Sequence, residues 1–227
     1  MGTDVLDEAL RMLDSEGIEG TFMLDDGVLS YATGDGRVVS ATLFMRRGRP
    51  TLLRAALAAP GRRVADVTAG LGADAFTLAA AGCQVTAFER SAVPWLLLRD
   101  ALRRAAADPL TAAAAARIAL VRGDARHILP CLLPFEVITV DPMFVPRKPF
   151  AGKRRAMEVF QDLAGPDDDA FELLEVALRA ATRRVSVKRQ VKAARLGERV
   201  PTGVITGRTV RFDIYAGTAP VHQEEEK

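Results

Sequence analysis

Cysteines, histidines and long apolar runs are scarce in this sequence of 227 residues, and each scarcity excludes a class of protein. Two cysteines, Cys83 and Cys131, cannot form the disulfide framework of a small secreted domain, and their apolar surroundings suit buried thiols in a reducing compartment. His127 and His222 stand alone, without the ligand spacing typical of zinc, so we expect no metal. No apolar stretch reaches the about 20 residues of a membrane-spanning helix, so we expect no membrane partner.

What is present suits a folded cytoplasmic protein. Hydrophobic residues make up 49% of the chain, which is enough to bury a substantial core. The opening residues MGTDVLDEAL are acidic and lack the basic start and apolar run of a signal peptide, so we expect a cytoplasmic location. No feature of the sequence indicates an oligomeric state.

The net charge is only +2, but the charges are unevenly distributed. Acids gather at the start of the chain, in residues 167–175 and in residues 224–226, whereas bases gather in residues 46–54, 147–155 and 183–199. Clusters of bases are typical of surfaces that bind nucleic acid, although so small a net charge does not by itself predict such binding.

Apolar strands alternate with helical segments from Val64 onward. The predicted strands are 64–67, 84–88, 117–121, 136–140, 183–188 and a closing pair near 203–206 and 209–217, and the predicted helices are 74–81, 91–107, 127–133 and 169–181. Such alternation predicts right-handed βαβ units. The short connection in the closing pair predicts an antiparallel hairpin. We therefore predict an α/β, Rossmann-like fold with a mostly parallel sheet and an antiparallel edge hairpin.

The segment before this alternation has a different pattern. Residues 18–44 contain short apolar runs separated by DDG and GDG, which predict strands joined in β-hairpins. We accordingly divide the chain into an N-terminal β-hairpin extension (1–55), the α/β domain (56–220) and an acidic tail (221–227) that we expect to be disordered.

The first predicted strand of the α/β domain runs into a glycine-containing turn. In DVTAGLGADAF, Asp66 ends the strand, and Gly70, Gly72, Ala73 and Asp74 form the turn and the start of a helix. The glycines allow a tight turn and a close approach to a ligand, and the helix start offers unpaired amides. This spacing also satisfies the dinucleotide-binding fingerprint, and such a turn is often only structural.

The next two strands also end in acids. Glu89, followed by Arg90, ends QVTAF at the position of an acid that accepts hydrogen bonds from a ribose, an arrangement shared by NAD and S-adenosylmethionine enzymes. Asp124, followed by Ala125, comes after RIALVRG, where a carboxylate can accept from an adenine amino group. Taken singly, Glu89 is equally typical of a solvated acid and Asp124 of a helix N-cap.

The fourth segment, DPMF, follows the apolar strand EVITV and carries the sharpest signal. The exocyclic amine of a base is a poor nucleophile because its lone pair is delocalised into the ring. The Asp141 carboxylate and the Pro142 carbonyl can accept hydrogen bonds from such an amine, and Phe144 can stack on the base. Asp-Pro is also a common turn initiator. The order of the four segments favours a site, because open α/β sheets bind ligands where their strands end.

These segments, together with VFQDLAGPDDDA, VSVKR and RFDIYAGT, resemble the bacterial small-subunit ribosomal RNA guanine-N2 methyltransferase J family over roughly residues 64–218. The resemblance implies a class I methyltransferase fold and transfer of a methyl group from S-adenosylmethionine to the 2-amino group of a guanine. It also implies that Asp74, Glu89, Arg90 and Asp141 are cofactor-site residues. The sequence departs from the family at Ala73, where the family has arginine, and at Asp124-Ala125, where it has two serines.

A basic segment directly after DPMF is a candidate for RNA binding. From Pro142 to Met157 the chain has five bases and no acids, and basic side chains position a nucleic acid through its phosphates. The expected partner is ribosomal RNA or the small ribosomal subunit. The predicted RNA-binding residues are Arg147, Lys148, Lys153, Arg154 and Arg155, extended by Lys188 and Arg189.

Several alternatives remain open at this point. The enzyme could methylate another amino-bearing substrate, such as adenine in DNA, a different RNA or a protein side chain. The fold could also serve as a nucleotide-binding or RNA-binding module without catalysis. An NAD-dependent oxidoreductase is a third possibility, but the predicted site lacks an identifiable proton donor for it.

Overall fold

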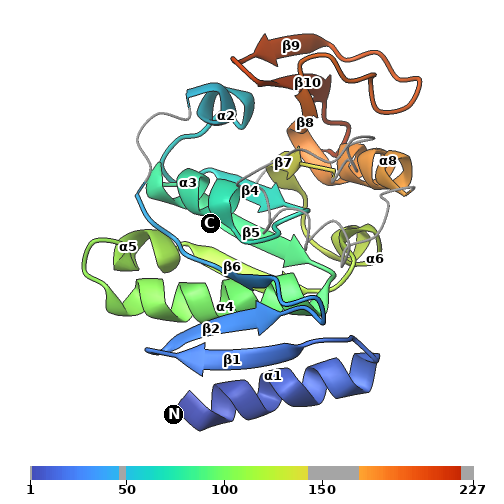
Figure 1. The fold of residues 1–227 in the computed structure, drawn as a ribbon. Coiled ribbons are helices and arrows are strands. Elements are labelled where there is room, and N and C mark those ends of the chain that lie inside the picture. Colours follow the sequence, from blue (N-terminus) through green and yellow to red (C-terminus); the bar gives the residue numbers. More distant parts are fainter. Residues whose placement is uncertain (1, 46–49, 143–168, 221–227) are drawn as a thin grey trace.

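A computed structural model of the chain describes residues 2–45, 50–142 and 169–220 (Figure 1). The helices and strands from β4 onward form one layered α/β structure, and residues 2–45 lie along one side of it. The predicted acidic tail (221–227) lies outside the described residues. In the described part of the chain, no helix combines the length and the apolar character needed to cross a bilayer.

A seven-stranded sheet in the order β6-β5-β4-β7-β8-β10-β9 forms the centre of the α/β part. Strands β4 to β8 pair in parallel, and β10 pairs antiparallel with both β8 and β9. The predicted mostly parallel sheet with an antiparallel edge hairpin is thus confirmed. The strand bounds are β4 (Arg63–Asp66), β5 (Gln84–Glu89), β6 (Ile118–Arg122), β7 (Phe135–Val140), β8 (Ala181–Gln190), β9 (Gly203–Thr206) and β10 (Val210–Ala216).

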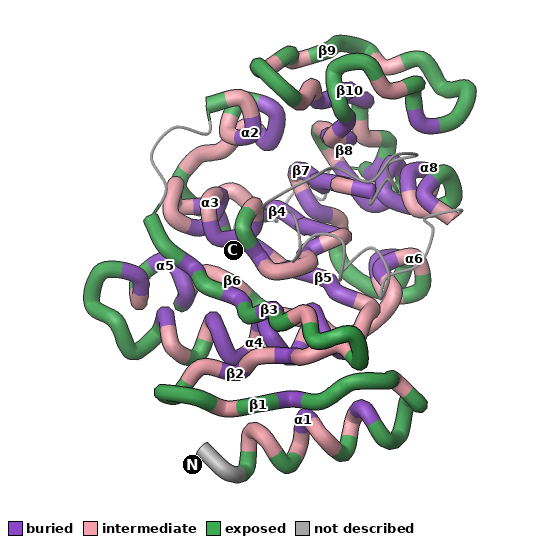
Figure 2. The backbone as a smooth tube through the Cα atoms, viewed as in Figure 1, coloured by how far each residue is buried: buried purple, intermediate pink, exposed green. Residues whose placement is uncertain are grey.

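Helices cover both faces of this sheet. Alternate residues of a strand point to opposite faces, so Val64 and Val137 belong to one apolar cluster and Ala65 and Ile138 to the other. Figure 2 shows the resulting buried centre along β4 and β7, with the edge strand β9 exposed. The first cluster includes α3 (Ala73–Ala80), α4 (Ala92–Ala107) and α5 (Ala112–Ala115), and the second includes α6 (Ala125–Ile128), the 3-10 helix η1 (Leu129–Cys131) and α8 (Ala170–Ala180).

Two further helices were not predicted from the sequence. The short helix α2 (Pro50–Ala55) packs against β9 and β10. The longer helix α1 (Gly2–Glu16) packs against β1 and α4, buries Ala9 and Leu13, and pairs Glu8 with Arg99 of α4 at 2.6 Å. Its apolar pairs Val5-Leu6, Ala9-Leu10 and Met12-Leu13 recur at the spacing of one helix face, a signal that the sequence prediction did not use.

The predicted N-terminal hairpins form a separate three-stranded antiparallel sheet of β1 (Thr21–Asp25), β2 (Val28–Ala32) and β3 (Val38–Ser40). Asp26 and Gly27 connect β1 to β2 with φ angles of 47° and 73°. A two-residue hairpin turn with both φ angles positive matches the twist of the strands, and Asp-Gly suits it. The DDG signal therefore predicted this turn correctly.

Helix α4 attaches the N-terminal sheet to the α/β part through Asp100. The carboxylate of Asp100 is fully buried and accepts hydrogen bonds from the Leu29 N–H at 3.1 Å, Arg104 Nε at 2.8 Å and Arg103 Nη2 at 3.0 Å. Arg104 also donates to the Ala41 carbonyl. Apolar side chains of β1, β2 and α4 belong to one cluster, so the segments on the two sides of the proposed boundary at residue 55 share a core.

Candidate active site

The four predicted segments meet where the parallel strands of the sheet end, along its carboxyl-terminal side. Asp66 ends β4, Glu89 ends β5, Asp124 follows β6 and Asp141 follows β7. Because these strands are parallel, their carboxyl ends lie at the same edge. The charges of Glu89, Asp141 and Lys188 all act on Asp66, so these residues form one electrostatic cluster.

The loop after β4 is tied to β5 and β7 by hydrogen bonds. The Asp141 N–H donates to Thr68 Oγ1 at 2.7 Å. Glu89, only 9% exposed, accepts from the Gly70 N–H and the Ser91 N–H, each at 2.8 Å. Glu89 thereby joins the glycine turn to the start of α4, and Thr68 holds the backbone of the DPMF segment. Thr68 was not among the predicted site residues.

The two glycines of the turn have different surroundings. Both have positive φ angles, 53° at Gly70 and 78° at Gly72. A Cβ atom added to Gly72 would lie 2.3 Å from Leu98 Cδ1, so this glycine is required by close packing against α4. Around a Cβ at Gly70 there is no atom of the described residues within 4 Å. Gly70 therefore presents open backbone, as close approach of a ligand requires.

Lys188 joins two of the predicted cofactor-site acids. Its ammonium group donates to Asp74 Oδ2 at 2.8 Å and to Asp141 Oδ2 at 2.6 Å. The sequence placed Lys188 among the RNA-binding bases, but in this structure its charge is directed into the acid cluster. Its neighbour Arg189 is 4% exposed and donates to the Ala194 carbonyl at 2.6 and 3.0 Å. We therefore do not carry Arg189 into an RNA-binding surface.

Asp124 caps a helix, which confirms the structural alternative for its local role. Its carboxylate accepts from the Arg126 N–H at 2.9 Å and pairs with the Arg126 guanidinium at 2.6 Å. These hydrogen bonds from Arg126 hold the pKa of Asp124 below its ordinary value. Arg90 pairs with Asp169 at the start of α8 and lies 3.9 Å from Asp124. The cofactor contacts of Arg90, Asp124 and the buried Ala125 stay predictions.

The buried carboxyl group of Asp66 has a strongly raised pKa. Burial raises its pKa from 3.8 to about 7, an effect opposed by the Thr68 N–H and the charge of Lys188 and increased by the carboxylates of Asp141 and Glu89. The Asp66 carboxyl group therefore titrates near neutral pH.

Substituting Asp66 by asparagine is expected to reveal this pKa in the stability of the protein. Because the folded state disfavours ionisation, the wild type loses stability as the pH rises from about 4 to about 7. Asp66→Asn carries no charge, so its free energy of unfolding relative to wild type should increase across the same window. Urea unfolding at both ends of the window measures it, and a difference independent of pH would contradict the raised pKa.

The remaining predicted site residues are placed as follows. Pro142 is buried directly after Asp141. Predicted residues outside the described part of the chain are Phe144, Arg147, Lys148, Lys153, Arg154 and Arg155. Among the described residues, no group of three or more histidine, cysteine, aspartate or glutamate side chains is arranged to hold a metal ion.

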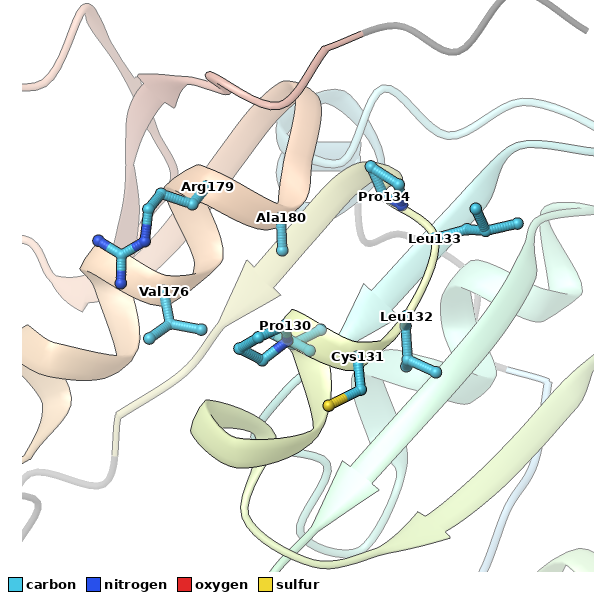
Figure 3. Close-up of a pocket in the computed structure, with 9 residues that line it drawn as sticks. Pro130, Cys131, Leu132, Leu133, Pro134, Val176, Arg179 and Ala180 are labelled. Atoms are coloured by element: carbon cyan, nitrogen blue, oxygen red, sulfur yellow. The ribbon is translucent and has the colours of Figure 1, made fainter.

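A cavity of about 440 Å³ lies away from this site, between η1 and α8 (Figure 3). It is lined by residues 129–134 and by Val176, Arg179 and Ala180, next to the first residues of β7 and β8. The acids of the cluster lie where β4, β5 and β7 end, which is the opposite edge of the sheet. The lining contains no acid, so this cavity has none of the predicted chemistry.

Comparison with known proteins gives relatives for most of the chain. Residues 38–217 match the family model described as "Putative SAM-dependent methyltransferase". A protein named ribosomal RNA small subunit methyltransferase J from Thioalkalivibrio sulfidiphilus is 48% identical over 155 residues, which are 67% of this chain and 61% of that protein. Its namesake from Chromohalobacter salexigens is 44% identical over 191 residues, which are 82% of this chain and 70% of that protein.

A solved structure shares the architecture over nearly the whole chain. The crystal structure of a SAM-dependent methyltransferase from Neisseria gonorrhoeae is 30% identical, has a TM-score of 0.72 and covers 92% of this chain and 87% of its own. This likeness confirms the class I methyltransferase fold that the sequence resemblance implied. The present chain spans about three fifths to seven tenths of the length of the two curated relatives.

Proposed function

This chain belongs to the ribosomal RNA small subunit methyltransferase J family, and we propose on that basis that it transfers a methyl group from S-adenosylmethionine to the 2-amino group of a guanine in small-subunit ribosomal RNA. The observation that carries the proposal is the convergence of Asp66, Glu89 and Asp141 at the carboxyl ends of neighbouring parallel strands. Such an edge is where open α/β sheets bind nucleoside ligands.

The residues of the site fit this cofactor. When bound, S-adenosylmethionine supplies an electrophilic methyl group on a positively charged sulfonium. A cluster rich in carboxylates suits a cationic ligand, and the open backbone at Gly70 leaves room for it. Both oxygens of Glu89 already accept a backbone N–H, but each has a second lone pair for a ribose hydroxyl. We assign Asp74 to the same cofactor site, at the first turn of α3.

Asp141 and Pro142 prepare the amine for reaction. Thr68 holds the Asp141 backbone and Lys188 holds Asp141 Oδ2, so we assign Asp141 Oδ1 and the Pro142 carbonyl to the two hydrogens of the guanine amine. Accepting both hydrogens favours a pyramidal nitrogen whose lone pair points at the methyl group. With the cofactor bound, the amine nitrogen would take the methyl group as the carbon–sulfur bond breaks, and the electron pair of that bond would stay on sulfur. The amine then releases one proton to Asp141 or to water.

We propose that Phe144 stacks on the target base and that the basic segment after it binds phosphates near that base. These assignments rest on the sequence, since Phe144 and residues 147–155 lie outside the described part of the chain. The expected substrate is the small ribosomal subunit or its RNA in the cytoplasm.

Reversing the charge of Arg154 and Arg155 together to glutamate tests the phosphate contacts. Loss of two phosphate contacts should weaken RNA binding. The fall of log K with log salt concentration should also become less steep, by about 2 in the slope. Reversal of Arg11 and Arg208, two exposed bases outside the basic clusters, serves as the control with the same change in charge. An unchanged salt slope in the Arg154/Arg155 variant would remove this segment from the RNA-binding surface.

The reaction itself is tested by transfer of labelled methyl groups to isolated small subunits and to their protein-free RNA, followed by analysis of the nucleosides. Label in 2-methylguanosine is the expected result. Label in methyladenosine or in protein would keep the methyltransferase and overturn the guanine assignment. Cofactor binding without transfer to any substrate would favour a module that binds nucleotide or RNA without catalysis.

A further inference from the structure

Lys188 stands between two carboxylates that come from different parts of the chain. Asp74 lies in the first turn of α3 and Asp141 directly after β7, and the Lys188 ammonium contacts both within 2.8 Å. We infer that Lys188 is a positioning residue for methyl transfer, which fixes the Asp141 carboxylate toward the amine and couples it to the cofactor site at Asp74. This inference rests on the proposed function.

The sheet fixes the place of Lys188. In the parallel pair of β7 and β8, Val140 lies opposite Val187, so Asp141 and Lys188 follow as neighbours at the sheet edge. The two residues on either side of Lys188, Val187 and Arg189, are buried on the other face of β8. The backbone of Lys188 therefore has little freedom, and its side chain is delivered to the acids by the strand register.

The hydrogen-bond geometry argues against an RNA phosphate as the main partner of Lys188. A lysine ammonium has three donors, and two of them are used by Asp74 and Asp141. The side chain is only 23% exposed. The third donor remains, but a phosphate that reached it would lie beside Asp74 and Asp141, in a cluster that also contains Asp66 and Glu89. These carboxylates would repel the RNA backbone.

One ammonium group shared by two acids links cofactor binding with amine binding. Lys188 lies between the Asp74 and Asp141 carboxylates and offsets the repulsion between them. A cationic ligand at Asp74 competes for one of the two contacts, and Lys188 can then turn fully to Asp141. The orientation of the residue that binds the amine thus depends on the occupancy of the cofactor site.

The test compares Lys188→Met and Lys188→Arg with Arg208→Met, which removes the same charge from an exposed base outside the basic clusters. At saturating S-adenosylmethionine, Lys188→Met should lower kcat about 10- to 100-fold, the range typical when the group that orients a reactive ligand is removed. The KM for RNA and the salt slope of RNA binding should stay at the wild-type values. Arg208→Met should match the wild type in kcat, in the KM for RNA and in the salt slope.

The conservative variant keeps the test decisive if methionine prevents folding. Arginine retains the charge but replaces a point donor by a planar fork, so Lys188→Arg should fold and show a kcat between those of Lys188→Met and the wild type. A wild-type kcat with a raised KM for RNA and a lower salt slope, in either variant, would identify Lys188 as a phosphate contact and overturn the inference.

A second readout separates this inference from the proposed reaction. Dissociation constants of S-adenosylmethionine and of the uncharged-sulfur product S-adenosylhomocysteine are measured by calorimetry without RNA. Removal of the Lys188 charge should favour binding of S-adenosylmethionine over S-adenosylhomocysteine. The ratio of the two dissociation constants should change by about 3-fold or more, as expected for one unit charge near the sulfur in a water-like medium. If the wild type methylates no RNA but the ratio shifts, the reaction is wrong and the link to the cofactor site stands. An unchanged ratio would remove that link.

Discussion

Substitution of Asp141 by asparagine is expected to lower kcat for methyl transfer about 10²- to 10³-fold, the loss typical when one preorganised hydrogen-bonding group is removed from a reacting centre. Asparagine keeps the size of the side chain but presents a single, uncharged acceptor oxygen, and its amide group repels the amine hydrogens. It also loses the ion pair with Lys188. The KM for RNA should change little, because the interaction belongs to the reaction rather than to RNA binding.

Glu136 offers a matched control on the same strand. It lies near the start of β7, at the opposite edge of the sheet from Asp141, and pairs with Arg62 and Arg183. Glu136→Gln removes the same charge, so kcat should stay within about 2-fold of wild type, as for a surface ion pair of small net energy. Single-turnover transfer of labelled methyl groups measures both variants. Wild-type turnover in Asp141→Asn would show that the amine binds elsewhere.

Substitution of Asp100 by alanine is expected to lower the free energy of unfolding by about 3–5 kcal/mol, the range found when one partner of a buried ion pair is removed. The side chain is fully buried, and its loss leaves Arg103, Arg104 and the Leu29 N–H without their acceptor. Urea unfolding measures the change. Asp7→Ala removes an exposed acid from α1 and should change stability by no more than about 0.5 kcal/mol.

The effect of Asp100→Ala should also depend on pH. Burial acts to raise the pKa of Asp100, but hydrogen bonds from Arg104, Arg103 and the Leu29 N–H outweigh it and lower the pKa below 3.8. A lowered pKa contributes stability that is present above the ordinary value and lost as the pH falls through the folded-state value. The difference from wild type should therefore be constant near neutral pH and shrink below about pH 4. Equal urea midpoints at neutral pH would show that α4 does not anchor the N-terminal sheet.

The strands of the fold could be predicted closely because their signals are local. Strand β7 was expected at 136–140 and is found at Phe135–Val140, and the closing hairpin pairs β9 with β10 as the short connection indicated. Helix α1 was not predicted, although its apolar residues recur at the spacing of one helix face. Packing of that face against β1 and α4 holds the helix in place. Tertiary contact, rather than intrinsic propensity, decides such helices.

Part of the candidate site could likewise be predicted from local sequence, and part depends on contacts between distant segments. The sequence showed that Asp66, Glu89, Asp124 and Asp141 each come at the end of a strand. Because these strands are parallel, that position alone predicts that the four acids lie at the same end of the sheet. The role of Lys188 depends on the register of β8 beside β7, which residue types do not reveal. The ion pair between Arg126 in α6 and Asp169 at the start of α8 likewise joins two helices that are far apart in the sequence.

The bond between the Leu29 N–H and Asp100 has a consequence for the synthesis of the chain. The two residues are 71 positions apart, so at about 5–20 residues per second the ribosome adds Asp100 roughly 4–14 s after Leu29. During this interval helix α4 is not yet available to cover β2. Leu29 and Tyr31, which are buried in the folded protein, then lack the packing that α4 provides. We expect the nascent N-terminal segment to be vulnerable to proteases and to need shielding until α4 emerges. Slow codons placed between the two would lengthen that exposure.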